Sequence, residues 1–107
     1  MSEHCTIEDG SDGCISIAGA LNFDTVSGVY RETERLFRTD KPIGSIDLSK
    51  LTMIDSAGLT LLLEWEALQH KSNKELKIRN APPELLSLAK LCEADEVMTL
   101  SGRDHPA

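Results

Sequence analysis

The stretch "SIDLSKLTMIDSAGLTLLLEW" (45–65) is the most informative about the fold, because its hydrophobic period changes from two residues to between three and four. Ile46 and Leu48 alternate with polar residues, which is typical of a strand with one buried face. Further on, leucines recur at helical spacing from Leu59, and Trp65 lies among them. The stretch therefore predicts a strand, a short polar loop and a helix with a wide apolar face.

Similar patterns continue on both sides of this stretch. Ile15 and Ile17 alternate with small residues between glycines, which indicates another strand. Pro82 or Pro83 suits the first turn of a second leucine-rich helix. The predicted strands lie within 14–21, 45–51 and 75–80, the predicted helices lie within 25–37, 57–71 and 81–95, and a short strand through Val97 and Met98 is a further candidate.

Strands that alternate with helices predict an α/β domain built from right-handed crossover connections. Because the predicted strands alternate instead of being apolar throughout, one face of the sheet should be partly open to solvent. We therefore expect a two-layer α/β fold. Residues 14–100 should form a single domain between a flexible N-terminal segment at 1–13 and a flexible tail at 101–107.

The charge of the chain limits the class of ligand. The 107 residues carry a formal net charge of −7, whereas nucleic acids and anionic membrane surfaces attract clustered Lys and Arg. A folded partner protein is the better expectation. The first residues are acidic where a secretory signal is basic, and no apolar run approaches the roughly 18 residues of a membrane span. We expect a cytoplasmic protein.

The three cysteines are odd in number and far apart, which favours reduced thiols over a disulfide framework. We expect Cys14 and Cys92 in the core. His4 beside Cys5 could begin a metal site, but no second His or Cys pair follows at ligand spacing. The sequence therefore predicts no metal and no cofactor.

Ser56 has two interpretations. The structural one is an N-cap, in which the serine oxygen accepts a hydrogen bond from a free N–H of the helix, a role that Asp55 could share. The functional one is a regulatory hydroxyl exposed at a strand-to-helix loop. A phosphate there would add roughly −1.5 to −2 charges and repel a partner that docks on the loop.

Catalysis has little support in the sequence. The "SAG" at 56–58 lacks the second glycine of a G-x-S-x-G elbow, and the glycine spacing matches neither a P-loop nor a dinucleotide fingerprint. We expect no enzymatic activity. A tryptophan on a leucine-rich helix usually packs in the core, but the second apolar stripe of this helix, formed by Leu61, Trp65 and Leu68, is also a candidate partner surface.

The stretch at 45–65 resembles the centre of the STAS domain, in which a D-[ST]-x-G-L motif opens a helix. The motif residues are Asp55, Ser56, Ala57, Gly58 and Leu59. The likeness continues through "LKIRNAPPELLSLAKLCEADEVM" (76–98). It implies a mixed sheet of about four to five strands with helices packed on one face.

Within that family, "GLTLLLEWEALQHKSN" (58–73) and "SLAKL" (87–91) resemble the MlaB-type branch. This resemblance implies a subunit that binds the ATPase of an ABC-type phospholipid transporter maintaining outer-membrane lipid asymmetry. Such a subunit lies in the cytoplasm, where its transporter complex could hold it at the inner membrane. The alternative is an anti-sigma factor antagonist, in which Ser56 is phosphorylated by a kinase-type anti-sigma factor. The serine at position 56 favours this alternative, because the MlaB branch usually has threonine at that position. The predicted partner-binding residues are Asp55, Ser56, Ala57, Gly58, Leu59, Leu61 and Trp65.

Overall fold

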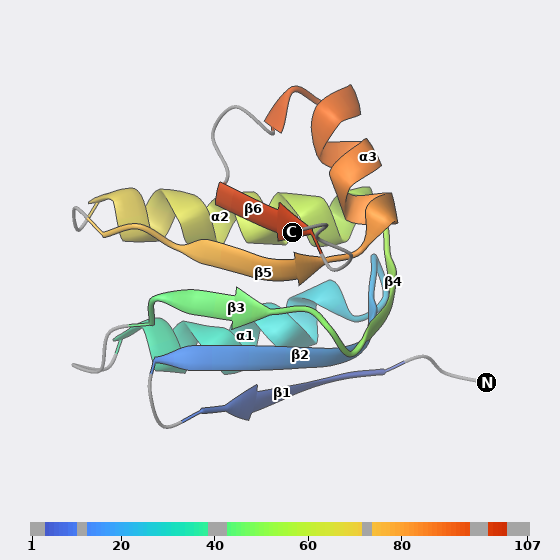
Figure 1. The fold of residues 1–107 in the computed structure, drawn as a ribbon. Coiled ribbons are helices and arrows are strands. Elements are labelled where there is room, and N and C mark those ends of the chain that lie inside the picture. The colour runs from blue at the N-terminus through green and yellow to red at the C-terminus, as the bar shows by residue number, and fades with distance from the viewer. Residues whose placement is uncertain (1–3, 11–12, 39–42, 72–73, 95–98, 103–107) are drawn as a thin grey trace.

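The computed structural model describes residues 4–10, 13–38, 43–71, 74–94 and 99–102, in which helices follow single strands or pairs of strands (Figure 1). The elements are β1 (Cys5–Asp9), β2 (Cys14–Leu21), α1 (Val26–Arg38), β3 (Ser45–Asp47), β4 (Leu51–Ile54), α2 (Ser56–Lys71), β5 (Lys77–Ala81), α3 (Pro83–Leu91) and β6 (Thr99–Gly102). None of the helices in these ranges is long and apolar enough to span a membrane.

The strands form one mixed sheet in the order β1-β2-β3-β5-β6, with β4 also paired to β2. β1 runs antiparallel to β2, and the other paired strands run parallel to their neighbours. Helices α1 and α2 lie on the same side of the sheet, whereas α3 contacts α2, β4 and β6 (Figure 1). The predicted α/β class, with a mixed sheet and helices on one face, is confirmed.

Burial alternates along the strands as the sequence predicts. Ile15, Ile17, Ile46 and Ile78 are fully buried against the helices. The residues that alternate with these isoleucines form the opposite face of the sheet. On this face Lys77 and Arg79 are exposed, as is Glu8 of β1, which pairs with Ser16. In the described part of the chain, this face therefore carries polar side chains and is open to solvent.

The core lies between the sheet and helices α1 and α2. Its largest fully buried side chain is Trp65 of α2, and Leu62 on the same helix and Leu85 on α3 are also fully buried. Complete burial of a large apolar side chain contributes about 1.5–3 kcal/mol to folding. The apolar residues of α2 therefore hold the helix tightly in place and leave its N-terminal end well positioned.

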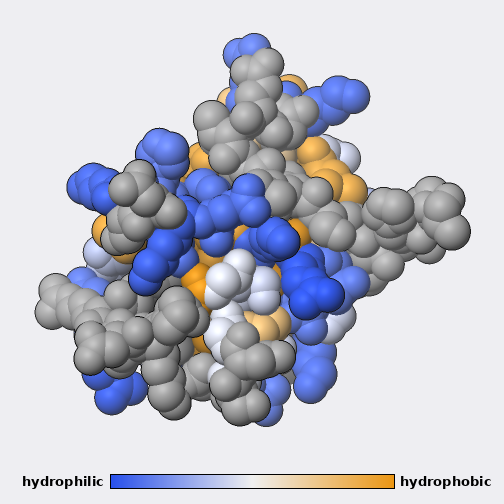
Figure 2. All heavy atoms as spheres, turned by 60° about the vertical axis from the view of Figure 1, so that its left-hand side comes forward, coloured by the Kyte–Doolittle hydropathy of each residue, from blue (hydrophilic) through white to orange (hydrophobic). Residues whose placement is uncertain are grey.

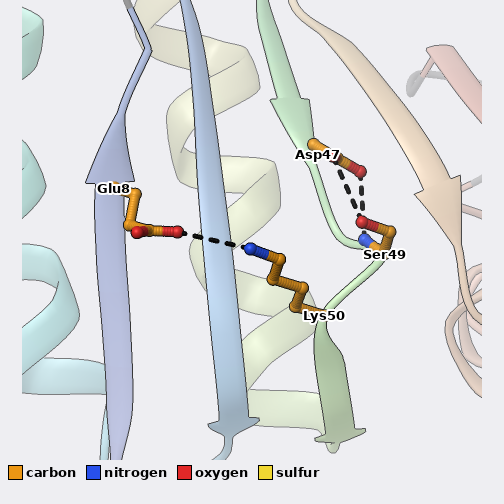
Figure 3. A network of polar contacts seen from close by, with 4 residues as sticks. All are labelled: Glu8, Asp47, Ser49 and Lys50. Carbon is orange, nitrogen blue, oxygen red and sulfur yellow. Dashed lines mark hydrogen bonds and ion pairs between the residues drawn. The ribbon is translucent and has the colours of Figure 1, made fainter.

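A turn at Ser49 and Lys50 divides the strand that was predicted at 45–51 into β3 and β4. Asp47 holds this turn, because its carboxylate accepts hydrogen bonds from the Ser49 N–H at 3.0 Å and the Ser49 hydroxyl at 3.2 Å (Figure 3). Opposite the turn, Gly19 has a φ of +103°, the pairing register shifts, and its N–H donates to the Lys50 carbonyl. The interruption lets β4 follow a new direction toward Asp55.

Lys50 also reaches over β2 on the open face and pairs with Glu8 of β1 at 3.6 Å (Figure 3). Both side chains are about two-thirds exposed, at 66% and 67%. An exposed ion pair contributes about 0–1 kcal/mol, because water and salt screen it. The pair is therefore a minor support for β1.

The N-terminal segment differs from the prediction of a flexible 1–13, because β1 occupies Cys5–Asp9 and pairs with β2. Its pattern is weak in sequence, since only Cys5 and Ile7 turn toward the core while Thr6 and Glu8 are exposed. At the other end, β6 extends to Gly102, into the predicted tail. The candidate strand at Val97 and Met98, and the remaining tail at 103–107, lie outside the described residues.

The cysteines also differ in part from the prediction. Cys14 is only half-buried, because it precedes Ile15 and so points to the open face of the sheet. Cys92 is exposed, because α3 ends at Leu91 and Cys92 lies at its C-cap. Burial, with a further contribution from the charge of Glu32, raises the pKa of the Cys5 thiol to about 11. Cys5 is therefore a protonated, unreactive thiol at neutral pH.

Candidate functional site

The carboxyl ends of β2 and β5, the β4–α2 junction and the start of α3 meet at one end of the molecule (Figure 1). In open α/β sheets, binding sites form preferentially at the carboxyl ends of the parallel strands, where loops leave the sheet. The predicted Asp55–Leu59 motif lies at this end. The motif therefore lies where a binding site is expected in a fold of this kind.

Asp55 is the residue that caps α2. Its Oδ1 accepts hydrogen bonds from the N–H groups of Ala57 at 2.9 Å and Gly58 at 3.2 Å. Its Oδ2 accepts a third from the N–H of Phe23 at 3.1 Å, in the loop between β2 and α1. The interpretation of Ser56 as the N-cap is therefore wrong, and the role that Asp55 could have shared belongs to Asp55. The same carboxylate ties the helix to a neighbouring loop.

Ser56 is the first residue of α2 and its side chain is exposed. Its carbonyl accepts a hydrogen bond from the Thr60 hydroxyl at 2.9 Å, within the helix. Its own hydroxyl makes no hydrogen bond with any residue in the described ranges. The hydroxyl is therefore available to a partner or to a modifying enzyme.

Gly58 lets the start of α2 approach the sheet closely. A Cβ at this position would lie 2.7 Å from the carbonyl oxygen of Leu21 and 2.7 Å from Cγ1 of Ile54. The following Leu59 is 2% exposed, and Ala57 is half-buried. These three residues position Asp55 and Ser56, and of the three only Ala57 keeps some contact with solvent.

The structure contradicts the predicted partner contacts through Leu61 and Trp65. Their exposed fractions are 4% and 0%. Helix α2 packs against more than the sheet, because α1 and α3 also contact it. Leu68 on this stripe is 39% exposed, but it lies three turns along the helix from Ser56.

A shallow groove runs between the start of α2 and helix α3. Its lining consists of Ile54, Asp55, Ser56, Pro83, Glu84, Ser87 and Leu88. The groove offers two carboxylates and two hydroxyls on an apolar floor, and none of the described residues that line it is basic. No three His, Cys, Asp or Glu residues come together as a potential metal site among the described residues. This arrangement suits recognition of a polypeptide.

Comparison with known proteins identifies the family of the chain. The family described as "Mlab, STAS domain" matches residues 6–100. This chain is a STAS domain. The comparison with curated proteins found no match to this chain. A solved structure of the anti-sigma factor antagonist SpoIIAA in its unphosphorylated form is similar to it, with a TM-score of 0.65 and 14% identity over 81% of this chain and 82% of that one. This likeness shows the shared fold, and STAS domains are protein–protein interaction modules.

Two exposed apolar residues of this STAS domain were missed by the sequence analysis. Phe23, whose N–H is held by Asp55, is 80% exposed, and Met53 at the end of β4 is 39% exposed. The available signal was "NFD" (22–24), an aromatic residue between polar residues and outside any periodic pattern. Periodicity selects core residues, so it passes over an apolar side chain in a loop.

Proposed function

We propose that this STAS domain is a non-enzymatic cytoplasmic subunit that binds and supports the ATPase of an ABC-type phospholipid transporter, one that maintains outer-membrane lipid asymmetry. The observation that carries the proposal is the exposed Ser56 hydroxyl at the rim of an acidic groove, in a chain whose family is described as Mlab. Asp55, Ser56 and Ala57 are the motif residues left to contact the ATPase.

The geometry supports docking by a rigid surface. Asp55 fixes the first turn of α2 through two hydrogen bonds, so the Ser56 hydroxyl is presented in one place and little conformational entropy is lost on binding. The net charge of −7 disfavours direct adsorption to anionic lipid. The subunit therefore reaches the inner membrane through its transporter.

Substitution of Ser56 tests the proposal. The tagged protein is isolated from its own cells, the captured proteins are identified by mass spectrometry, and the affinity for the purified ATPase subunit is then measured. We expect Ser56→Glu to weaken binding about ten-fold or more, because it adds a third acid to a groove that already holds Asp55 and Glu84. Ser56→Ala should have a smaller effect.

Thr60→Glu is the matched control, since Thr60 is an exposed hydroxyl residue one turn further along the same helix and outside the groove. Its affinity should stay within about two-fold of the wild type, as exposed charges distant from an interface contribute little. Capture of no ABC ATPase, or equal affinity of folded wild type and Ser56→Glu, would contradict docking at this site.

Regulation of a kinase-type anti-sigma factor is the second candidate function. Serine at position 56 and the structural likeness to SpoIIAA favour it. In this case the captured partner is a histidine-kinase-like ATPase that transfers phosphate from ATP to Ser56 and no longer binds the phosphorylated form. Phosphate incorporation that Ser56→Ala abolishes would select this function over the transporter subunit.

A further inference from the structure

We propose that Phe23, supported by Met53, is the hydrophobic anchor of the partner interface, and that it takes a partner segment carrying apolar residues next to Arg or Lys. This inference rests on the proposed function and deepens it, because it names the surface beside Ser56 and the chemistry of what binds there. It also replaces the buried Trp65 and Leu61 as the apolar part of the interface.

Exposure is the first observation. Phe23 is 80% exposed and Met53 39% exposed, while the ends of their strands are paired, with Ala20 opposite Met53 and Leu21 opposite Ile54. The Asn22 side chain contacts the Met53 sulfur at 4.0 Å. Exposed aromatic side chains commonly provide the largest contributions at protein interfaces. Asn22 and Asp55, which bind the Met53 sulfur and the Phe23 N–H, hold both residues at the end of the molecule that carries Ser56.

Rigidity of the Phe23 loop is the second observation. Asn22 is buried, and its Oδ1 accepts hydrogen bonds from the N–H groups of Asp24 at 2.9 Å and Thr25 at 3.2 Å. The Thr25 hydroxyl donates to the Ala20 carbonyl at 2.8 Å. Asp55 accepts from Phe23 itself. An exposed aromatic residue on so constrained a loop loses little entropy on binding, which is the property of a preorganised anchor.

The third observation is the negative charge near Phe23, which indicates the kind of partner segment that binds there. Acidic side chains lie beside Phe23 and in the groove: Asp24 follows Phe23 in the chain, Asp55 accepts a hydrogen bond from its N–H, and Glu84 lines the groove together with Asp55. Neither 14–30 nor 51–69 contains a Lys or Arg. A surface of this sign attracts and orients a basic segment and repels an acidic one. The partner segment is therefore both apolar and basic.

The other end of the molecule offers a contrast. Figure 2 brings the amino ends of β2, β3 and β5 forward, and the described surface there is mainly hydrophilic, with hydrophobic residues visible only between polar ones. A shallow depression at this end is lined by Glu75, Lys77 and Arg79 together with Gly13, Gly44 and Ser45. Lys77 and Arg79 thus line the depression at this end, and neither is among the described residues that line the groove beside Ser56.

Affinity measurements on the full chain with the purified transporter ATPase subunit test this inference. We expect Phe23→Ser to raise the dissociation constant about ten-fold or more. Leu91→Ser is the matched control, because Leu91 is 81% exposed at the far end of α3, and it should change the constant less than about two-fold. Both side chains are exposed, so thermal melting should show both variants folded.

Salt tests the charge of the partner segment. Raising the ionic strength from about 0.01 M to about 0.15 M shortens the range of electrostatic attraction and should weaken wild-type binding several-fold. The double variant Asp24→Asn, Glu84→Gln should lose most of this salt dependence while Phe23→Ser keeps it. If wild-type binding did not depend on salt, the proposal that the partner segment is basic would be wrong.

Phe23→Trp gives a second readout. The native Trp65 is buried, so the new indole adds an exposed emission that should move to shorter wavelength when the ATPase subunit covers it. No shift, or equal losses for Phe23→Ser and Leu91→Ser, would overturn the anchor. If Ser56→Glu weakens binding while Phe23→Ser does not, only this inference fails. If the wild type does not bind the ATPase subunit at all, the proposed function fails with it.

Discussion

At the scale of single residues, the site depends on which of two adjacent polar side chains caps α2. Serine and aspartate are both good N-caps, so sequence cannot choose between Asp55 and Ser56. The backbone hydrogen bonds show which residue is the cap. The Asp55 N–H still donates to the Leu21 carbonyl of β2, whereas the Asp55 carbonyl accepts the first helical hydrogen bond, from the Leu59 N–H. Asp55 is thus the last extended residue, and Ser56 is left exposed for other roles.

The roles of these two residues predict different stabilities for their alanine variants. Asp55→Ala removes the cap of α2 and the partner of the Phe23 N–H, so it should lower the free energy of unfolding by about 1–2 kcal/mol. Ser56→Ala should change it by no more than about 0.5 kcal/mol. Urea denaturation followed by circular dichroism measures both. A loss for Ser56→Ala as large as that for Asp55→Ala would assign the cap to the serine after all.

At the scale of elements, strongly periodic segments were predictable and weakly patterned ones were not. The α2 and β2 segments carry leucine and isoleucine periods that packing reinforces. The Asp47 turn is different, because it depends on Asn80 and on a bulge at Gly19, which are far away in sequence. β1 likewise exists through its pairing with β2. In the site, the STAS motif identified Ser56 and the leucine-rich helix favoured a buried Trp65, whereas the exposure of Phe23 depends on how the loops assemble.

Gly58 shows the contact between α2 and the sheet most directly. Alanine has the better helix propensity by about 1 kcal/mol, but its Cβ would press on the Leu21 carbonyl, a backbone atom. Gly58→Ala should therefore lower the free energy of unfolding by about 1–3 kcal/mol. Gly28 of α1 has nothing within 4 Å of the same atom, so Gly28→Ala should stabilise by up to about 1 kcal/mol. Chemical denaturation compares them, and equal effects would contradict the close approach.

At the scale of the whole molecule, two carboxyl groups give folding opposite dependences on pH. Burial alone would raise the pKa of Asp47, but hydrogen bonds from Asn80 and Ser49 and the charge of Arg79 outweigh it and hold the pKa below its usual range. Burial, together with the charge of Glu75, raises the pKa of Glu66. A lowered carboxyl pKa stabilises the fold at neutral pH and a raised one destabilises it there, because folding favours the form with the better interactions.

The pH dependence of the free energy of unfolding should separate the two groups. The contribution of Asp47 is present above its unfolded pKa of about 3.9 and is lost as the pH falls through the lower folded value. Asp47→Asn should therefore be less stable than the wild type near neutral pH, with a smaller difference in acid. Glu66→Gln should gain stability near neutral pH and lose that gain in acid, since Glu66 is protonated there in both states. Urea midpoints at both pH values measure the differences. Below the folded pKa of Asp47, Asp47→Asn and the wild type should therefore differ little in their free energy of unfolding. If the difference stayed as large there as at neutral pH, the charge of the carboxylate would not stabilise the turn that leads β4 to Asp55. The hydrogen bonds of the side chain alone would then have to stabilise it.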